Sequence, residues 1–252
     1  MPSVQLVLSR TRKEKLKEQV ALIGGEAANT NRDAVLDADV VIVAVKPSIL
    51  AEVMKEISEH VKKDGVVISV VTGKTIAFMK SYFQGLEKSI SCVRVMPNIG
   101  ALVSQSATGF ATDGTVSEEH KKIVKDILGA FSGCVVEVLE PQLDAVTGVS
   151  GSGIAYILLA MEAMIEGGVK VGLSRSVARD LVIQSAFGAA RLAKLQNRAG
   201  EESLATIREK IITPGGTTAE GLFQLEKRNV RATFSLAVEK AAKKSAKLSK
   251  VK

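Results

Sequence analysis

The sequence predicts an α/β fold, a doubly wound parallel sheet, followed by an all-helical second domain. Up to about residue 140, short β-branched apolar runs alternate with helix-like segments, which is the pattern of strand-helix-strand units. Beyond Pro141 the strand signals stop, and the remaining apolar pattern is helical. We therefore expect a first domain at residues 1–140 and a second at residues 141–252.

Composition narrows the class of protein. The chain has 252 residues, 46% of them hydrophobic, which is enough for a core. It has no Trp and only two Tyr, so we expect no aromatic platform for nucleic-acid bases and no nucleic-acid partner. The net charge of +7 is concentrated in residues 10–17 and 240–252. A solvated helix and a loose tail explain those charges as well as an anionic partner does.

The cysteines and the apolar runs bear on the compartment. Cys92 and Cys134 lie in strand-like runs without metal-ligand spacing, so we expect buried free thiols, no metal and a reducing compartment. The best membrane-span candidate, residues 154–165, is short and carries Glu162. No secretory signal is visible. We expect a cytoplasmic protein with no membrane partner, and an organellar presequence upstream of Met1 is the open alternative.

The first strand, at residues 4–8, is expected to end in Ser9-Arg-Thr-Arg12, with a helix at residues 13–19. A hydroxyl and two arginines there suit a ribose 2′-phosphate, because guanidinium pairs with phosphate through two hydrogen bonds. That would favour NADP over NAD. A basic helix start on the surface explains the residue types about as well.

The next strand is expected at residues 40–45, six apolar residues typical of a strand buried on both faces of a parallel sheet. Ligands of open α/β sheets lie beyond the carboxyl ends of the strands, so the segment from Ala44 to Pro47 is expected to face a cofactor. A lysine such as Lys46 is otherwise most often solvated. The other elements expected in this domain are helices at residues 48–60, 76–83 and 117–131 and strands at residues 66–71, 90–96, 108–112 and 134–138.

In the second domain we expect long helices at residues 154–167 and 174–196, with an apolar stripe that would seek another copy of the chain. Residues 213–226 read as a sharp turn that feeds an amphipathic helix, and Thr217 and Glu220 have capping-box spacing. A helix start of this kind binds anions, so a small carboxylate could lie there beside Thr217 and Thr218. From spacing alone, a capped helix without a ligand is the commoner explanation.

Four stretches in the same order resemble the pyrroline-5-carboxylate reductases, and the resemblance runs from about residue 4 to about residue 245. They are Ala44-Val-Lys-Pro47, Val93-Arg-Val-Met-Pro-Asn98, Asp144-Ala-Val-Thr-Gly-Val-Ser-Gly-Ser-Gly-Ile-Ala-Tyr156 and Thr213-Pro-Gly-Gly-Thr-Thr-Ala-Glu-Gly-Leu-Phe-Gln-Leu-Glu226. The resemblance implies a Rossmann-like domain, a helical dimerisation domain, and reduction of 1-pyrroline-5-carboxylate to L-proline by NADPH, with NAD as a possible substitute.

The resemblance also implies residue roles. Thr218 would hydrogen-bond the substrate ring nitrogen as the catalytic residue, and Gly216, Thr217 and Thr218 would hold the substrate carboxylate. Glu201 matches a position that meets the ring amine in some members of the family. From its sequence context alone, it would be interpreted as a solvated acidic residue near a helix start. The residues expected to bind the cofactor are Ser9, Arg10, Arg12, Asn31, Ala44, Val45, Lys46, Pro47, Val70, Val71, Thr72, Gly73 and Asn98.

One departure from the family concerns the phosphate-binding turn. The chain has no Gly-x-Gly-x-x-Gly turn after a first strand, so it is expected to begin at the family's second strand, with an incomplete sheet. The alternative hypothesis is therefore a catalytically impaired oligomerising or regulatory paralogue that cannot hold the dinucleotide. A basic nucleic-acid binder, a third reading, rests on charge alone.

Overall fold

The structure is a computed structural model that describes residues 5–87, 89–196 and 202–250. The chain forms two compact units, the first made of Met1–Gly151 and Ala241–Lys252 and the second of Ser152–Lys240. These units divide the chain after Gly151, whereas the sequence suggested a boundary at residue 140, and they return the end of the chain to the first unit.

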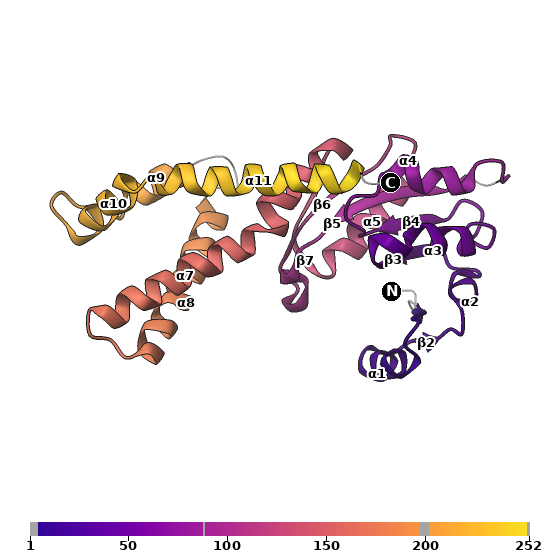
Figure 1. Cartoon of the computed structure of the whole chain (residues 1–252), viewed down its shortest axis with the longest axis horizontal. Coiled ribbons are helices and arrows are strands. Elements are labelled where there is room, and N and C mark those ends of the chain that lie inside the picture. Colours follow the sequence, from indigo (N-terminus) through magenta and orange to yellow (C-terminus); the bar gives the residue numbers. More distant parts are fainter. Residues whose placement is uncertain (1–4, 88, 197–201, 251–252) are drawn as a thin grey trace. The chain divides into compact units, whose positions relative to one another are not determined.

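The first unit contains a five-stranded sheet in the order β3-β4-β5-β6-β7 (Figure 1). Its strands are β3 (Val40–Val43), β4 (Val66–Ser69), β5 (Ser91–Met96), β6 (Ser106–Ala111) and β7 (Ser132–Glu137). The three strands β3, β4 and β5 are parallel and are joined through η1 (Pro47–Ile49), α3 (Leu50–Ile57), α4 (Ile76–Lys80) and η2 (Ser81–Phe83). The α/β class expected from the sequence is confirmed.

One strand departs from the parallel arrangement. β6 runs antiparallel to β5, because the connection between them holds only the short 3-10 helix η3 (Ile99–Val103) and is too short for a crossover. The connection from β6 to β7 contains α5 (Glu118–Gly129), and these two strands are parallel.

The first two strands form a separate sheet. β1 (Val7–Leu8) and β2 (Glu26–Ala27) pair in parallel, with α1 (Lys13–Ile23) between them in sequence, and α2 (Asn31–Val35) leads on to β3. In the described residues neither β1 nor β2 pairs with the five-stranded sheet. The first unit therefore has a sheet in two pieces, as expected for an incomplete doubly wound fold.

The core of the first unit lies on both faces of the five-stranded sheet. On one face, Val67 of β4 packs in a cluster with Leu50 and Met54 of α3. On the other, the neighbouring residue Ile68 packs in a cluster with Val124 and Leu128 of α5. This alternation along β4 is what the two-residue period of a strand produces when helices cover both faces.

β3 is covered on one face only. Val41 and Val43 are buried, whereas the Ile42 side chain is 52% exposed. The expectation that this strand is buried on both faces is therefore wrong, because β3 is the edge strand of its sheet and, in the described chain, pairs only with β4.

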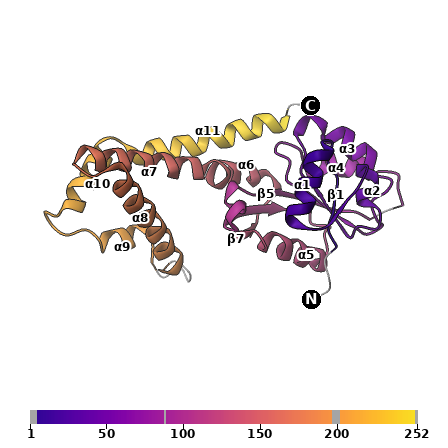
Figure 2. The same cartoon turned by 90° about the horizontal axis from the view of Figure 1, so that it is seen from below.

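Helices make up the remainder. The first unit continues with η4 (Glu140–Gln142), α6 (Leu143–Val146) and the π-helical turn η5 (Thr147–Gly151). The second unit contains α7 (Gly153–Lys170), α8 (Arg175–Gln196), α9 (Leu204–Glu209), α10 (Thr217–Lys227) and the start of α11 (Val230–Lys250). α7 and α8 lie side by side (Figure 2).

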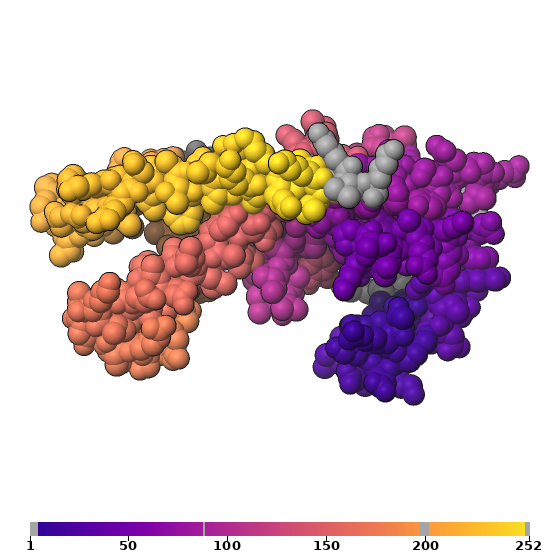
Figure 3. Space-filling view, viewed as in Figure 1, coloured from indigo at the N-terminus to yellow at the C-terminus, as the bar shows by residue number. Residues whose placement is uncertain are grey.

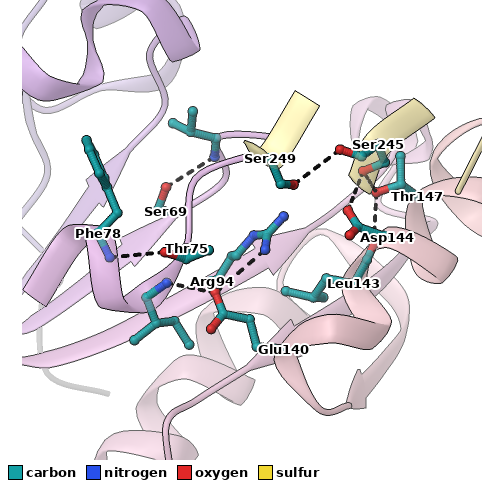
Figure 4. Close-up of polar contacts among 12 residues, drawn as sticks. Ser69, Thr75, Phe78, Arg94, Glu140, Leu143, Asp144, Thr147, Ser245 and Ser249 are labelled. Carbon is teal, nitrogen blue, oxygen red and sulfur yellow. Dashed lines mark hydrogen bonds and ion pairs between the residues drawn. The ribbon is translucent and has the colours of Figure 1, made fainter. Parts of the chain in front are cut away.

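The lysine-rich end is helical, not the loose tail that its composition suggested. Ser245 of α11 is 2% exposed, and its hydroxyl donates a hydrogen bond to Asp144 Oδ1 at 2.6 Å (Figure 4). Sequence composition could not reveal this, because the partner lies about a hundred residues earlier in the chain.

One helical stretch, Glu140–Lys170, passes a length-and-composition test for a membrane span, with a mean hydropathy of 1.5 and 11% of the window buried. This stretch is longer than the candidate span of residues 154–165 that the sequence suggested, because helical structure continues beyond both ends of those residues. One such helix among the described residues is weak support for a membrane span. Exposed apolar side chains on α7 include Ile157, Leu158, Leu159 and Met164.

Candidate functional site

Two predicted cofactor residues meet at the end of β1. The Ser9 hydroxyl donates to Asn31 Oδ1 at 2.9 Å. The Asn31 side-chain amide donates to Glu56 Oε2 at 2.7 Å, and its backbone N–H donates to Glu56 Oε1 at 3.2 Å. Glu56 belongs to α3, which packs on the five-stranded sheet. These contacts therefore connect the small β1–β2 sheet, in the indigo part of Figure 3, to the helix that covers the larger sheet.

A groove of about 190 Å³ lies between β1 and β3. Four of the predicted cofactor residues line it, namely Ser9, Asn31, Ala44 and Val45. Most of the remaining lining is apolar and comes from β1, β3 and α3. The structure thus places residues from three predicted stretches around one groove.

Of the charged candidates for the cofactor site, Arg10 is half-buried and Arg12 and Lys46 are exposed. Arg10 Nη1 donates to Gln19 Oε1 at 2.9 Å, and Arg12 immediately precedes α1. Lys46 and Pro47 are exposed at the start of η1. None of these four side chains lines the groove, so their assignment to a cofactor stays a prediction.

Gly73 lies in the turn between β4 and α4, and the structure shows why this position is a glycine. Gly73 has φ +80°, and a Cβ added there would lie 3.1 Å from the backbone of Leu248 in α11. The close approach that this glycine permits is therefore to α11. The neighbouring Val71 is buried and its N–H donates to Ser69 Oγ at 3.2 Å, whereas Val70 and Thr72 are half-buried.

Asn98 is engaged within the fold. Its Oδ1 accepts from the Gly100 N–H at 3.0 Å, and its Nδ2 donates to the Ser150 carbonyl at 3.1 Å. Its backbone N–H donates to Ser106 Oγ at 2.9 Å. These hydrogen bonds within the fold are enough to explain why an asparagine stands at this position. Its role towards a cofactor stays a prediction.

The residues of the first unit fit part of a dinucleotide. A hydroxyl, an amide and two arginines lie near the end of β1, and these groups suit a ribose phosphate. In the part of the chain that the structure describes, the strand-to-helix turns contain no Gly-x-Gly-x-x-Gly cradle for a pyrophosphate.

Sequence reasoning missed a buried ion pair in the first unit. Arg94 of β5 is 6% exposed, and its Nη1 lies 3.6 Å from Glu140 Oε1 (Figure 4). The same carboxylate oxygen accepts a hydrogen bond from the Ile76 N–H, at the start of α4, at 2.7 Å. The sequence did contain a signal for this pair, namely an arginine inside the apolar run at residues 90–96. A charge buried in a strand requires a partner of opposite charge.

In the second unit, the predicted bend begins α10 in a different way from that expected. Gly215 has φ +67°, and Gly216 is the N-cap, with φ −80° and ψ 165°. Thr217 is the first helical residue, so the expected Thr217 capping box is wrong. A cap needs non-helical backbone angles, which Gly216 provides.

This helix start has no side-chain cap. The Gly216 N–H donates to the Thr213 carbonyl at 2.9 Å, so the donors open to a ligand begin at Thr217. The side chain of Thr217 is exposed and that of Thr218 is half-buried. Uncapped N–H groups in a first turn suit a small anion such as a carboxylate. Glu201 lies outside the described residues.

Both cysteines are free thiols, as expected, but only one of them is buried. Cys92 is buried, and burial raises the pKa of its thiol to about 12. Cys134 is exposed, because it lies on β7 at the edge of the sheet. Within residues 5–87, 89–196 and 202–250, no group of three or more His, Cys, Asp or Glu side chains could hold a metal ion.

Two family profiles match the chain. Residues 140–248 match the pyrroline-5-carboxylate reductase dimerisation family, and residues 3–73 match the family of F420-dependent NADP oxidoreductases. The second match covers the segment that contains Ser9, Asn31 and the β3 strand.

Individual relatives agree. A pyrroline-5-carboxylate reductase from Methanosarcina acetivorans is 36% identical over 93% of this chain and 84% of its own length. The enzyme of that name from Pisum sativum is 34% identical over 99% of this chain and 88% of its own length.

Solved structures are also similar. A pyrroline-5-carboxylate reductase structure from Coxiella burnetii has a TM-score of 0.88 and 32% identity, and covers 97% of this chain and 88% of that one. A Plasmodium falciparum pyrroline carboxylate reductase with NADP bound has a TM-score of 0.81 and 28% identity, and covers 99% of each chain. The chain belongs to the pyrroline-5-carboxylate reductase family of oxidoreductases.

Proposed function

We propose that this protein reduces 1-pyrroline-5-carboxylate to L-proline with NADPH, the last step of proline biosynthesis. The observation that carries the proposal is the uncapped start of α10 behind Gly215 and Gly216, in a chain of this family. Its donors match the one fixed charge of the substrate, a carboxylate.

The chain's own residues position the substrate. The N–H groups of Thr217 and Thr218 hold the carboxylate, and the Thr218 hydroxyl hydrogen-bonds the ring nitrogen and can relay its proton. A strongly acidic side chain is not needed when the ring is already an iminium. The bound nicotinamide supplies the hydride, so the protein mainly orients the imine carbon.

NADPH is proposed over NADH because of the basic residues after β1. Arg10 is half-buried and Arg12 is exposed, and Ser9 lies on the groove beside Asn31. A 2′-phosphate would gain charge-assisted hydrogen bonds from the guanidinium groups that a hydroxyl would not. An Arg10→Gln, Arg12→Gln double variant should lose preference for NADPH over NADH in kcat/KM, and an unchanged preference would contradict this assignment.

We also propose a homodimer through the second unit, because α7 and α8 expose apolar side chains and the dimerisation family matches this region. The exposed residues include Leu158 and Leu159 of α7 and Leu181 and Phe187 of α8. Sedimentation of wild type and of a Leu158→Glu variant tests this, and a wild-type monomer at all concentrations would refute it. A cytoplasmic location is proposed from the free thiols, and cell fractionation tests it.

The reaction is tested by NADPH oxidation that depends on added pyrroline-5-carboxylate. Thr218→Ala should lower kcat/KM by about a hundredfold, the scale of losing one positioned hydrogen-bond donor. Thr233→Ala is the matched control, because Thr233 lies on α11, where its hydroxyl donates to the Asn229 carbonyl at 3.1 Å. Equal turnover by both variants would remove Thr218 from the mechanism.

The impaired-paralogue alternative is favoured by one observation, namely that no glycine cradle lies in the described strand-to-helix turns. A fluorescence titration with NADPH separates the two functions. Binding in the micromolar range would exclude a paralogue that cannot hold the dinucleotide, whereas no binding and no turnover would support it.

A further inference from the structure

The turn that follows β4 is contacted by two segments that lie far from it in sequence. This turn, residues 70–75, connects β4 to α4, and β4 lies between the parallel strands β3 and β5. Open α/β sheets bind their ligands beyond the carboxyl ends of parallel strands. The position of this turn therefore bears directly on any cofactor that the sheet binds.

On one side, the turn packs against the end of α11. A Cβ added to Gly73 would lie 3.1 Å from the Leu248 carbonyl group and 3.2 Å from the Ser249 backbone nitrogen. Ala241–Lys252 belong to the same compact unit as the turn. Because backbone packs on backbone here, the turn has little room to move towards α11.

On the other side, the turn ends at the start of α4, which is fixed by Glu140. The Ile76 N–H donates to Glu140 Oε1 at 2.7 Å, and the same oxygen lies 3.6 Å from Arg94 Nη1 (Figure 4). Arg94 is 6% exposed, so a buried cation keeps this carboxylate in place. The first turn of α4 is therefore anchored to the segment that follows β7.

One helical turn of that segment connects both contacts. Glu140 and Asp144 are about one turn apart in the continuous helical stretch that begins at Glu140. Asp144 Oδ1 accepts a hydrogen bond from the Ser245 hydroxyl at 2.6 Å, and Ser245 is 2% exposed. Glu140 thus fixes α4 and Asp144 fixes α11, on either side of residues 70–75.

We propose that Asp144 and Ser245 are positioning residues for the turn after β4 and, through this turn, for the cofactor. The cofactor part of this inference rests on the proposed function. The hydrogen bond between Asp144 and Ser245 keeps the end of α11 against Gly73, so the turn is ordered before a ligand arrives. Binding then does not have to order the turn, which favours affinity.

Hydrogen exchange of the cofactor-free chain tests this contact directly. Ser245→Ala removes the hydroxyl donor and should speed exchange at residues 70–76 about tenfold, the scale of losing one hydrogen bond to a charged group. Ser249→Ala is the matched control, because its hydroxyl donates to the Ser245 carbonyl within α11 at 3.2 Å, and it should leave this exchange unchanged. Residues 91–96 of β5 report global opening, and their exchange should change less than that of residues 70–76 in Ser245→Ala.

Two substitutions at Asp144 separate the hydrogen bond from other consequences of changing this residue. Asp144→Asn keeps an Oδ1 acceptor and should retain most of the protection at residues 70–76, whereas Asp144→Ala should lose it as Ser245→Ala does. The Asp144→Ala, Ser245→Ala double variant should exchange little faster than either single variant, because each single variant already removes the same bond.

A fluorescence titration with NADPH extends the test to the cofactor. Ser245→Ala should raise the Kd for NADPH by about threefold or more, because the turn is then less often in the position that the cofactor binds. Ser249→Ala should leave this Kd unchanged. In turnover, the KM for NADPH should rise in Ser245→Ala while the KM for pyrroline-5-carboxylate stays near the wild-type value.

Three results would overturn the proposal. These are equal exchange at residues 70–76 in the two serine variants, equal acceleration at residues 70–76 and 91–96 in Ser245→Ala, or an unchanged Kd for NADPH in Ser245→Ala. A wild type that neither binds NADPH nor reduces pyrroline-5-carboxylate would refute the proposed function instead. The exchange comparison would still decide whether Asp144 and Ser245 position the turn, because it is made on the cofactor-free chain.

Discussion

The bend before α10 gives a sharp prediction, because two glycines of the same region differ in their surroundings. A Cβ added to Gly216 would lie 2.2 Å from Thr213 Oγ1 and 3.0 Å from the Thr213 carbonyl oxygen. A Cβ added to Gly221, inside α10, would meet no atom within 4 Å. Both residues have backbone angles that alanine can adopt, so contact alone should separate the two substitutions.

The expected magnitudes have opposite signs. Gly216→Ala should lower the free energy of unfolding by about 1 to 3 kcal/mol, the usual cost of overpacking. The Thr213 hydroxyl can rotate away, but the carbonyl oxygen belongs to the turn and must shift. Gly221→Ala should raise the free energy of unfolding by about 0.5 to 1 kcal/mol, since alanine is the better helix former.

Urea unfolding followed by circular dichroism measures both changes. A Thr213→Ala, Gly216→Ala double variant should recover part of the loss, because it removes the 2.2 Å contact and keeps the 3.0 Å contact. If the donors of the first turn hold the substrate carboxylate, Gly216→Ala should also raise the KM for pyrroline-5-carboxylate, whereas Gly221→Ala should not. Equal stability of the two alanine variants would refute the steric reasoning.

Three further predictions concern the first unit. Glu140→Gln should lower the free energy of unfolding by about 3 kcal/mol, because it leaves the buried Arg94 charge without its partner; this is the low end for a buried pair, since the Glu140 side chain is 24% exposed. Glu118→Gln, at a carboxylate that is 86% exposed, should have no measurable effect in the same urea titration. Iodoacetamide at pH 8 should alkylate Cys134 and spare Cys92 in the folded protein, as mass spectrometry would show. The raised pKa of Cys92, about 12 against an ordinary 9.0, means that only the unfolded thiol ionises just above pH 9, so stability should fall as the pH rises from there towards 12. Rapid alkylation of Cys92, or stability unchanged above pH 9, would contradict its burial.

Local pattern determined much of the fold. The runs that became β4 and β5 were recognisable because most of their residues are apolar and several are β-branched, and α8 was recognisable from its long helical pattern. These signals lie within a few residues of each other and need no tertiary information. The four family motifs likewise depend only on the order of residues, and they sufficed to place the chain in its family.

The site could be predicted only in part. The sequence identified Ser9 and Asn31 as candidates, but their hydrogen bond to each other joins residues from different elements. The spacing of Thr217 and Glu220 predicted a capping box, and it was wrong because the backbone of Gly216, not a side-chain spacing, determines where α10 begins. Which residues carry the cofactor and the substrate stays a prediction.

By itself, the sequence determined where most strands and helices lie, which family the chain belongs to, and that the glycine turn of that family is not among its motifs. Only the tertiary structure decided that the sheet is in two pieces, that β6 is antiparallel, and that Ser245 and Arg94 are buried against distant carboxylates. The physical reason is sequence separation. Local pattern reports which face of an element is apolar, whereas pairing and burial depend on partners that chain folding brings from far along the sequence.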